Sequence, residues 1–363
     1  MAEGTPSRSP ASSGPEVTTP RADSPKATRP EVERFDSGDG RKVYRLPMEV
    51  FSGFWGNAYL VTGGARPILV DCGSGQPASN RNLSEAFEVI GQRYGETVRL
   101  ADVGEVVLTH GHIDHFGGLG YVREQSNARV SIHVLDRGVV GSYRERVAMA
   151  VRHLELFFRS AGVSEDKLGG FMASYGKTKA LFSQGDIDEA FEEGPILDGQ
   201  LEAIHVPGHC PGQVCLRAGV LLMTADHLLE RISPHLSPES ITLSTGLWHY
   251  MRSLERVEQL DGVRLGLGGH GNAIDDLKRR VAETRASHAE RLSRVLDLCR
   301  EPKPIVELSR SLFGHQASYH VLLALLETGA LVEYLYQRGE LTVANAADVE
   351  RGGGPAVILY RRA

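Results

Sequence analysis

The stretch THGHIDHFGG, residues 109–118, places three histidines and an aspartate within six positions and sets the strongest limit on the fold. Buried imidazole and carboxylate groups without partners are costly, so crowding them together requires a compensating interaction. The apolar run EVVLT directly before the histidines is typical of a buried strand. A metal ion bound where this strand ends would account for both observations.

The spacing inside this stretch is the spacing of metal ligands. His110 and His112 are two residues apart, so on extended backbone their side chains point to the same side, and Gly111 permits close approach. Asp114 and His115 follow at a turn, where two later glycines let the backbone double back. We expect this turn to aim Asp114 and His115 at a neighbouring position, which favours two ions over one.

Three further candidate ligands stand at the ends of predicted strands. His209 lies in VPGHCPG, where two Pro-Gly steps form a rigid loop after LEAIHV. Asp226 ends the apolar run LLMTAD, and His270 ends LGLGGHG between glycines. These positions complete a candidate set of seven metal-binding side chains.

The patterns HxHxDH, PGH, an aspartate after an apolar strand and GGHG resemble the metallo-β-lactamase-fold superfamily over about residues 40–272. The match is specific because all seven ligand positions are filled in the expected order. The segment ERISPHLSPES, after Asp226, resembles a loop of a subgroup related to glyoxalase II and other small hydrolases. The resemblance implies an α/β fold, a four-layer αβ/βα sandwich with a helical insertion.

Carried over residue by residue, the resemblance implies seven ligands of two metals. The first metal would be held by His110, His112 and His209, the second by Asp114, His115 and His270, with Asp226 bridging the two. Nitrogen and carboxylate ligands suit two Zn²⁺ ions first, with iron or manganese as alternatives. Two ions about 3.5–4 Å apart turn a bridging water into a hydroxide nucleophile near neutral pH. Asp114 would also be catalytic, orienting the hydroxide or passing its proton to the leaving group.

The resemblance implies a dinuclear hydrolase of activated acyl compounds, a thioester first and a lactone second. Its expected partner is therefore a small-molecule acyl substrate. The alternative is a mononuclear iron oxygenase of the persulfide-dioxygenase kind, which shares the fold and would differ in metal content and oxygen consumption. A purely structural metal is disfavoured because such sites are usually closed and four-coordinate. Superfamily nucleases carry a domain inserted between the last two ligands, and the span from Asp226 to His270 is too short for one.

Four side chains are candidates for contacting the substrate. Phe54 and Trp55 lie in the hairpin loop of FSGFWGNAYL, which in the superfamily overhangs the metals, and an apolar mini-core is the equal alternative. Tyr175 belongs to the helical insertion, the expected lid, and His235 lies in the loop after Asp226. Cys210 follows His209, and we expect strand alternation to turn its thiol away from the metal into the core. A third kind of metal ligand and a redox-sensitive thiol are the alternatives for Cys210.

The chain divides into three predicted parts. Residues 1–34 are a proline-rich segment that buries too little apolar surface to fold, so we expect a disordered tail. Residues 35–275 form the catalytic domain, with the helical insertion at about 137–192. Residues 276–363 resemble a winged-helix-like domain, with helices near 274–300, 304–312 and 316–328 followed by a hairpin built from EYLYQRG, LTVAN and PAVILYRR.

Composition and charge limit the kinds of partner that this protein can bind. The net charge of −6 and the absence of Lys and Arg from 316–328 argue against nucleic acid, so we expect the C-terminal domain to pack against or complete the pocket. A homodimer through its apolar helix is an open alternative. The four cysteines form no CxxC pair, and neither a signal sequence nor a membrane-spanning run is evident. We therefore expect a cytoplasmic protein that does not bind a membrane.

Overall fold

The computed structural model describes residues 29–180, 185–316, 319–351 and 356–363. The predicted disordered tail falls mainly on residues 1–28, which lie outside the described residues. Strand β1 (Glu33–Asp36) and the buried Val32 before it already belong to the folded domain. Folded backbone therefore begins slightly before residue 34, where the predicted tail ends.

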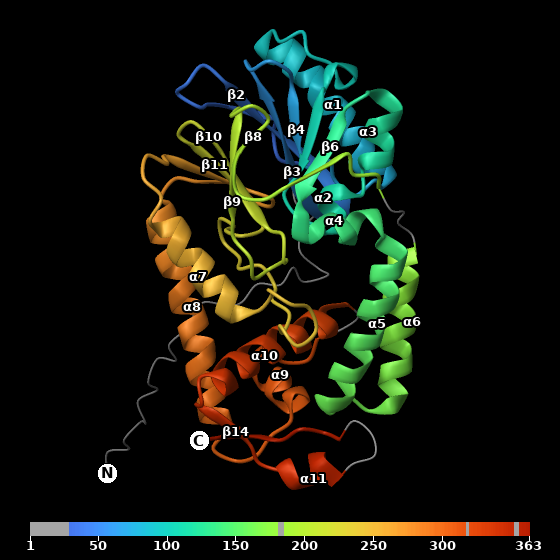
Figure 1. The fold of residues 1–363 in the computed structure, drawn as a ribbon, viewed down its shortest axis with the longest axis vertical. Helices are drawn as coiled ribbons and strands as arrows, with labels where there is room; N and C mark the ends of the chain where they lie inside the picture. The colour runs from blue at the N-terminus through green and yellow to red at the C-terminus, as the bar shows by residue number, and fades with distance from the viewer. Residues whose placement is uncertain (1–28, 181–184, 317–318, 352–355) are drawn as a thin grey trace, which may run out of the picture.

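Two mixed sheets form the centre of the protein (Figure 1). The first sheet has seven strands in sequence order, β1, β2 (Lys42–Phe51), β3 (Phe54–Thr62), β4 (Ile68–Val70), β5 (Glu105–Leu108), β6 (Arg129–His133) and β7 (Glu189–Phe191). The second sheet has the order β13 (Ala273–Ile274), β12 (Leu265–Gly268), β11 (Leu221–Ala225), β10 (Val214–Ala218), β9 (Leu201–His205) and β8 (Gly194–Ile196). Strands β4 to β7 run parallel, as do β11 and β12. The carboxyl ends of neighbouring parallel strands therefore lie at the same edge of each sheet, and the loops that follow these strands start there.

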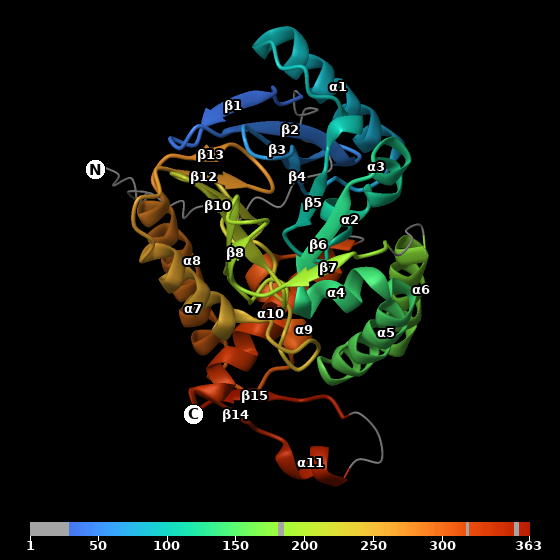
Figure 2. The same cartoon turned by 45° about the horizontal axis from the view of Figure 1, so that its top comes forward.

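The two sheets pack face to face through apolar side chains, and helices pack on the outer face of each sheet, which gives four layers. Val70 and Val107 of the first sheet pack against Leu216 and Met223 of the second. The outer faces are covered by helices, α1 (Pro77–Tyr94), η1 (Leu100–Asp102), α2 (Ile113–Phe116) and α3 (Leu119–Gln125) on the first sheet and α7 (Leu247–Glu258) and α8 (Leu277–Leu298) on the second (Figure 2). The predicted four-layer αβ/βα sandwich is therefore confirmed.

A helical segment separates β6 from β7, as the sequence predicts. It consists of α4 (Val134–Gly141), α5 (Tyr143–Ser160) and α6 (Glu165–Ala180). Helices α5 and α6 lie side by side and extend away from the sheets in both views (Figures 1 and 2). The end of α5 is bonded to the C-terminal segment, because the Val306 amide donates to the Ala161 carbonyl and the Ile358 amide to that of Ser160, both at 2.9 Å.

The C-terminal segment is helical and lies between the α5–α6 pair and the α7–α8 pair (Figure 1). After α8 it contains α9 (Ile305–Phe313), α10 (Tyr319–Gln337), β14 (Leu341–Val343), α11 (Ala346–Arg351) and β15 (Tyr360–Arg362), with β14 and β15 antiparallel. Its buried side chains join those of α5, α7 and the second sheet in one apolar cluster. We find no helix among the described residues with the length and hydropathy of a membrane span.

One predicted element is wrong. The stretch EYLYQ, expected to begin the C-terminal hairpin, is the last turn and a half of α10, and the strands that pair are β14 and β15. Helix α10 is buried along most of its length, and Leu335 within that stretch is 1% exposed. Tertiary burial outweighs the β propensity of its tyrosines. The winged-helix assignment and the boundary at residue 276 stay predictions.

Candidate metal centre

The seven predicted ligands come together at the carboxyl ends of the strands. Strand β5 leads into His110 and His112, β11 into Asp226, and β12 into His270. Three overlapping groups have all their potential ligand atoms within 4.8 Å of one another: His110, His112, His209 and Cys210; His110, His115 and Asp226; and Asp114, His115 and His270. Residues up to 160 positions apart therefore form one cluster, and it combines imidazole nitrogens with carboxylate oxygens.

Hydrogen bonds outside the cluster fix the orientation of its imidazoles. The Nδ1 atom of His209 lies 2.9 Å from the carbonyl of His235, and that of His270 lies 2.8 Å from the carbonyl of Trp55. A carbonyl only accepts, so Nδ1 carries the proton in both rings. Each Nε2 then presents a lone pair to the cluster, which is the tautomer that a metal requires.

The Asp71 carboxylate orients two further imidazoles, those of His110 and His115, through hydrogen bonds. Asp71 accepts from the Thr109 hydroxyl at 2.8 Å and lies 2.8 Å from Nδ1 of His115. Because the Thr109 hydroxyl donates to Asp71, its oxygen is left to accept from Nδ1 of His110, 3.0 Å away. Four imidazoles of the cluster are thus held with Nε2 directed inward.

Several of the inward atoms have no hydrogen-bond partner in the part of the chain that the structure describes. Among the described residues, Nε2 of His110, His115 and His209 and Oδ1 of Asp226 are buried without one. Leaving a buried polar atom unsatisfied costs about 1–3 kcal/mol. Several such atoms converging on one point fit a bound cation, and this donor set fits a divalent metal.

The Asp226 carboxylate lies between the two halves of the cluster. Its Oδ1 is 3.4 Å from Nε2 of His115, and its Oδ2 is 3.6 Å from Nε2 of His209 and 3.5 Å from Nε2 of His270. Asp114 approaches only one half, with Oδ2 3.4 Å from Nε2 of His270. This arrangement places Asp226 where a bridging ligand would sit.

The histidine pKa values also differ between the two halves of the cluster. Burial holds the pKa of His110, His112 and His209 below its ordinary value. Burial also opposes protonation of His270, but Asp226 and Asp114 raise the pKa of that imidazole to about 10. The facing imidazoles in turn hold the pKa of both carboxyls below the usual range, although burial acts against them. The imidazoles of the first half are therefore uncharged, while in the second half the two carboxylates favour a positive charge, which a bound cation can supply in place of a proton.

Asp136 in the first turn of α4 links two of the ligand loops. Its Oδ2 accepts from the Gly111 amide and its Oδ1 from the Gly212 amide, both at 2.8 Å. A Cβ on Gly212 would come within 2.7 Å of the Asp136 carboxyl carbon, so only glycine permits this approach. Burial raises the pKa of Asp136 to about 6. Neither Asp71 nor Asp136 was predicted as part of the site, although each stands at or just beyond the end of an apolar strand.

The expectation for Cys210 is wrong. Its Sγ lies 3.3 Å from Nε2 of His112 and belongs to the same ligand group as His110 and His209. Strand alternation does not apply, because residues 206–213 form a loop between β9 and β10 rather than extended strand. The thiol therefore points at the metal site rather than into the core.

The candidate substrate residues are placed at different distances from the cluster. The Phe54 ring lies 4.6 Å from that of His270, and the His235 ring stacks on His112 at 5.6 Å. Trp55 reaches the cluster through its carbonyl. Tyr175 is half-buried on α6 against the apolar cluster that contains α10.

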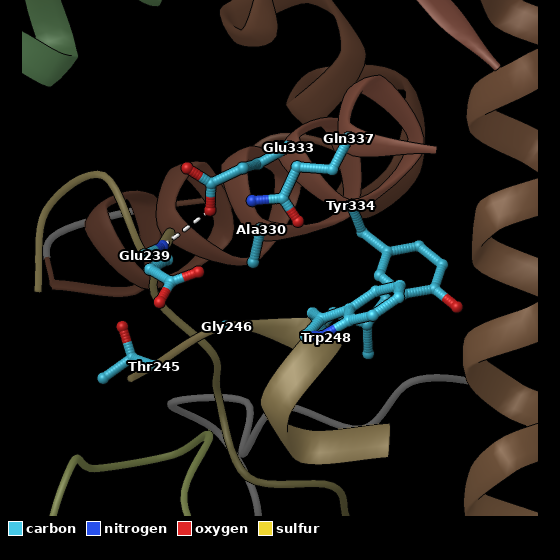
Figure 3. Close-up of a pocket in the computed structure, with 9 residues that line it drawn as sticks. Glu239, Thr245, Gly246, Trp248, Ala330, Glu333, Tyr334 and Gln337 are labelled. Carbon is cyan, nitrogen blue, oxygen red and sulfur yellow. Dashed lines mark hydrogen bonds between the residues drawn. The ribbon is translucent and has the colours of Figure 1, made fainter. Parts of the chain in front are cut away.

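The C-terminal segment reaches the site through the loop after β11. Glu327 of α10 accepts from the Leu236 amide at 2.8 Å, next to the carbonyl that orients His209, and pairs with Arg291 at 3.2 Å. Figure 3 shows the adjoining hollow, where Glu333 of α10 accepts from the Glu239 amide at 2.6 Å. Helix α10 thus holds the loop that supports a ligand, a link that local sequence patterns do not reveal.

Comparison with known proteins agrees with this geometry. The chain is 25% identical over 297 residues to the "Probable metallo-hydrolase YqjP" of Bacillus subtilis, covering 78% of this chain and 88% of that protein. It is 22% identical to the "Atrochrysone carboxyl ACP thioesterase" of Aspergillus fumigatus, covering 62% of this chain and 54% of the thioesterase.

A solved structure and a family model also match this chain. The crystal structure of a metallo-beta-lactamase family protein from Thermus thermophilus superposes with a TM-score of 0.70 at 28% identity, covering 88% of this chain and 98% of that one. Residues 53–270 match the family model of the Metallo-beta-lactamase superfamily. The chain belongs to the metallo-beta-lactamase superfamily.

Proposed function

We propose that this protein is a dinuclear metal-dependent hydrolase of activated acyl compounds, with a thioester as the first candidate substrate and a lactone as the second. The observation that carries the proposal is the position of Asp226, whose two oxygens face histidines of both halves of the cluster. A mononuclear or structural site would not need a carboxylate between two sets of inward-facing ligands.

The cluster would hold one divalent ion in each half. The first would bind His110, His112 and His209, the second Asp114, His115 and His270, with Asp226 shared. When bound, the ions would supply a water activated near neutral pH and would polarise a substrate carbonyl. Zinc suits these ligands first, and iron and manganese are alternatives.

Asp114 is the residue placed to move a proton. Its side chain is 15% exposed, compared with 2% for His115, and its carboxyl is held ionised by His115 and His270. A carboxylate oxygen of Asp114 can accept a proton from the attacking water and deliver it to the departing thiolate or alkoxide. Its neighbours are fixed by Asp71 and by the Trp55 carbonyl, which keeps this oxygen in position.

The surroundings of the cluster favour an apolar acyl group. Phe54 lies against the His270 ring, and half-buried Phe157, Phe171 and Met172 of the α5–α6 pair pack against the apolar cluster that contains α10. The thioesterase relative supports the same substrate class.

The decisive experiment measures metal content by elemental analysis on the full chain purified without added metal, beside a screen of acyl thioesters and lactones. We expect about two zinc ions per chain and turnover of at least one thioester. Asp114→Asn should abolish turnover while circular dichroism stays unchanged, and Asp261→Asn, at an exposed loop position, should keep it. A content of one iron per chain, together with oxygen uptake when a persulfide is added, would contradict the hydrolase proposal and support the oxygenase alternative.

A second experiment tests the pocket. We expect Trp55→Ala and Tyr175→Ala to change the preference for acyl chain length, measured as kcat/KM across a series of thioesters. Trp248→Ala is the matched control, because this second tryptophan is 42% exposed and its ring lies 6.0 Å from that of Tyr334 in the hollow of Figure 3. An unchanged preference in the Trp55 and Tyr175 variants would remove both residues from the pocket.

A further inference from the structure

The thiol of Cys210 lies among the ligands of the first half of the cluster. Its Sγ is 3.3 Å from Nε2 of His112 and shares one ligand group with His110 and His209. Cys210 is 6% exposed, so bulk water does not solvate it. A separate observation points to a ligand at this place: Nε2 of His110 and of His209, both buried, have no hydrogen-bond partner among the described residues.

The contact with His112 cannot persist once a metal is bound. The Nε2 lone pair of His112 is the only acceptor on that atom, and a metal would take it. The thiol would then face a cation at ligand distance and a histidine that no longer accepts its proton. Thiolate is the form of cysteine that binds metals, and a nearby cation stabilises it.

We propose that Cys210 is a further protein ligand of the first metal, bound as a thiolate beside three imidazoles and the shared Asp226 carboxylate. The proposal rests on the dinuclear site of the proposed function. When the metal–sulfur bond forms, the S–H bond breaks and its proton passes to solvent, so the metal-bound site carries one positive charge fewer than it would with a neutral thiol.

This assignment makes the two halves of the centre unequal. A set of three nitrogens, one sulfur and the shared Asp226 carboxylate would prefer soft or borderline ions such as Zn²⁺, Co²⁺ and Cd²⁺ over Mn²⁺. The anionic sulfur also reduces the electrophilic strength of the first ion. The ion that Asp114, His115 and His270 would hold would therefore be the stronger Lewis acid of the two.

The test is an optical titration of the metal-free full chain with Co²⁺. Cobalt bound by histidines and carboxylates gives visible d–d bands, whereas a thiolate ligand adds a charge-transfer band in the near ultraviolet. We expect that band to grow with the metal and to be lost in Cys210→Ser while the d–d bands remain. Cys215→Ala is the matched control, because Cys215 is buried in β10 and its Sγ contacts the Thr224 carbonyl.

The possible results separate the two proposals. Visible d–d bands without a charge-transfer band, or a charge-transfer band that survives in Cys210→Ser, would overturn the assignment of Cys210 and leave the dinuclear site standing. Failure of the wild-type chain to bind any cobalt would overturn the proposed function itself. X-ray absorption of the wild-type zinc protein gives a result that needs no variant, since a bound thiolate places one sulfur at about 2.3 Å from zinc.

Discussion

Asp71 holds His115 and Thr109 with a single oxygen, lying 2.8 Å from Nδ1 of the imidazole and 2.8 Å from the hydroxyl oxygen. Its other oxygen accepts from the Thr109 amide at 2.8 Å. The residue adopts a φ of 59°, a left-handed conformation that aspartate tolerates better than most side chains. One carboxylate at the end of β4 thus fixes the loop that carries four of the candidate ligands.

Replacing Asp71 with asparagine should weaken metal binding in the second half of the cluster. The amide nitrogen of asparagine is a donor, so in one orientation His115 and the Thr109 hydroxyl both lose their acceptor. In the other orientation the Thr109 backbone amide loses its acceptor, which loosens the start of the ligand loop. Loss of such a supporting bond typically lowers metal affinity about 10–100-fold. Competition with a chelator should show this loss in Asp71→Asn but not in Asp261→Asn, which changes an exposed loop residue. Equal affinities would mean that the imidazole is held by packing alone.

Replacing Asp136 with alanine should both destabilise the fold and disturb the first half of the cluster. The amides of Gly111 and Gly212 would lose their common acceptor in a buried place, at about 1–3 kcal/mol each. Urea unfolding should therefore show a loss of about 2–6 kcal/mol in Asp136→Ala. Asp136→Asn should lose about half as much, because one acceptor remains. A drop in stability without weaker metal binding would show that the two loops hold their geometry without this link.

The candidate ligands could be predicted because each follows a recognisable local pattern. His110 and His112 flank a glycine directly after an apolar strand, and Asp226 ends another such strand, so strand prediction alone brings them near one edge. The supporting carboxylates, Asp71 and Asp136, carry no comparable spacing. An acid after a strand is common, and only the three-dimensional arrangement shows which acids face a ligand.

Other features of the fold and the site depend on contacts between residues far apart in the sequence, which a local pattern does not encode. The direction of the Cys210 side chain depends on a loop, where the two-residue alternation of strands has no meaning. The length of α10 depends on burial against α8, α9 and the insertion, which outweighs the propensity of its own residues. The bond from Glu327 to Leu236 joins residues separated by 91 positions.

Replacing Glu327 with leucine should reveal whether the C-terminal segment supports the metal centre. The change removes the acceptor of the Leu236 amide and leaves Arg291 without its buried partner. Breaking a buried ion pair on one side costs about 3–5 kcal/mol. Because the neighbouring carbonyl of His235 orients His209, we also expect weaker binding of the first metal.

The Glu327→Gln variant separates the two effects. Glutamine keeps a carbonyl oxygen for the Leu236 amide but loses the charge that pairs with Arg291. We therefore expect lower stability in urea with metal affinity close to that of the wild type. If Glu327→Leu is destabilised to the same extent and binds metal equally well, the loop that contains His235 and Leu236 is positioned without α10.

The acid stability of the chain should depend on His288, which is fully buried in α8 with its ring 5.5 Å from that of Tyr250. Burial, assisted by Arg291, lowers the pKa of His288 from 6.5 to about 3. The folded pKa lies below the unfolded one, so the unfolded chain takes up the proton first as the pH falls. The contribution of the neutral ring is complete above about pH 6.5 and is lost progressively toward pH 3.

We therefore expect the free energy of unfolding of the metal-free wild type to fall more steeply than that of His288→Leu between pH 6 and pH 4. The difference should be about 1 kcal/mol per pH unit. Urea unfolding at several pH values gives the comparison, and taking the difference between the two chains cancels the groups that both contain. His315→Leu, at an exposed position, controls for the loss of one histidine. Parallel curves for wild type and His288→Leu would mean that His288 is solvated or paired before the chain unfolds.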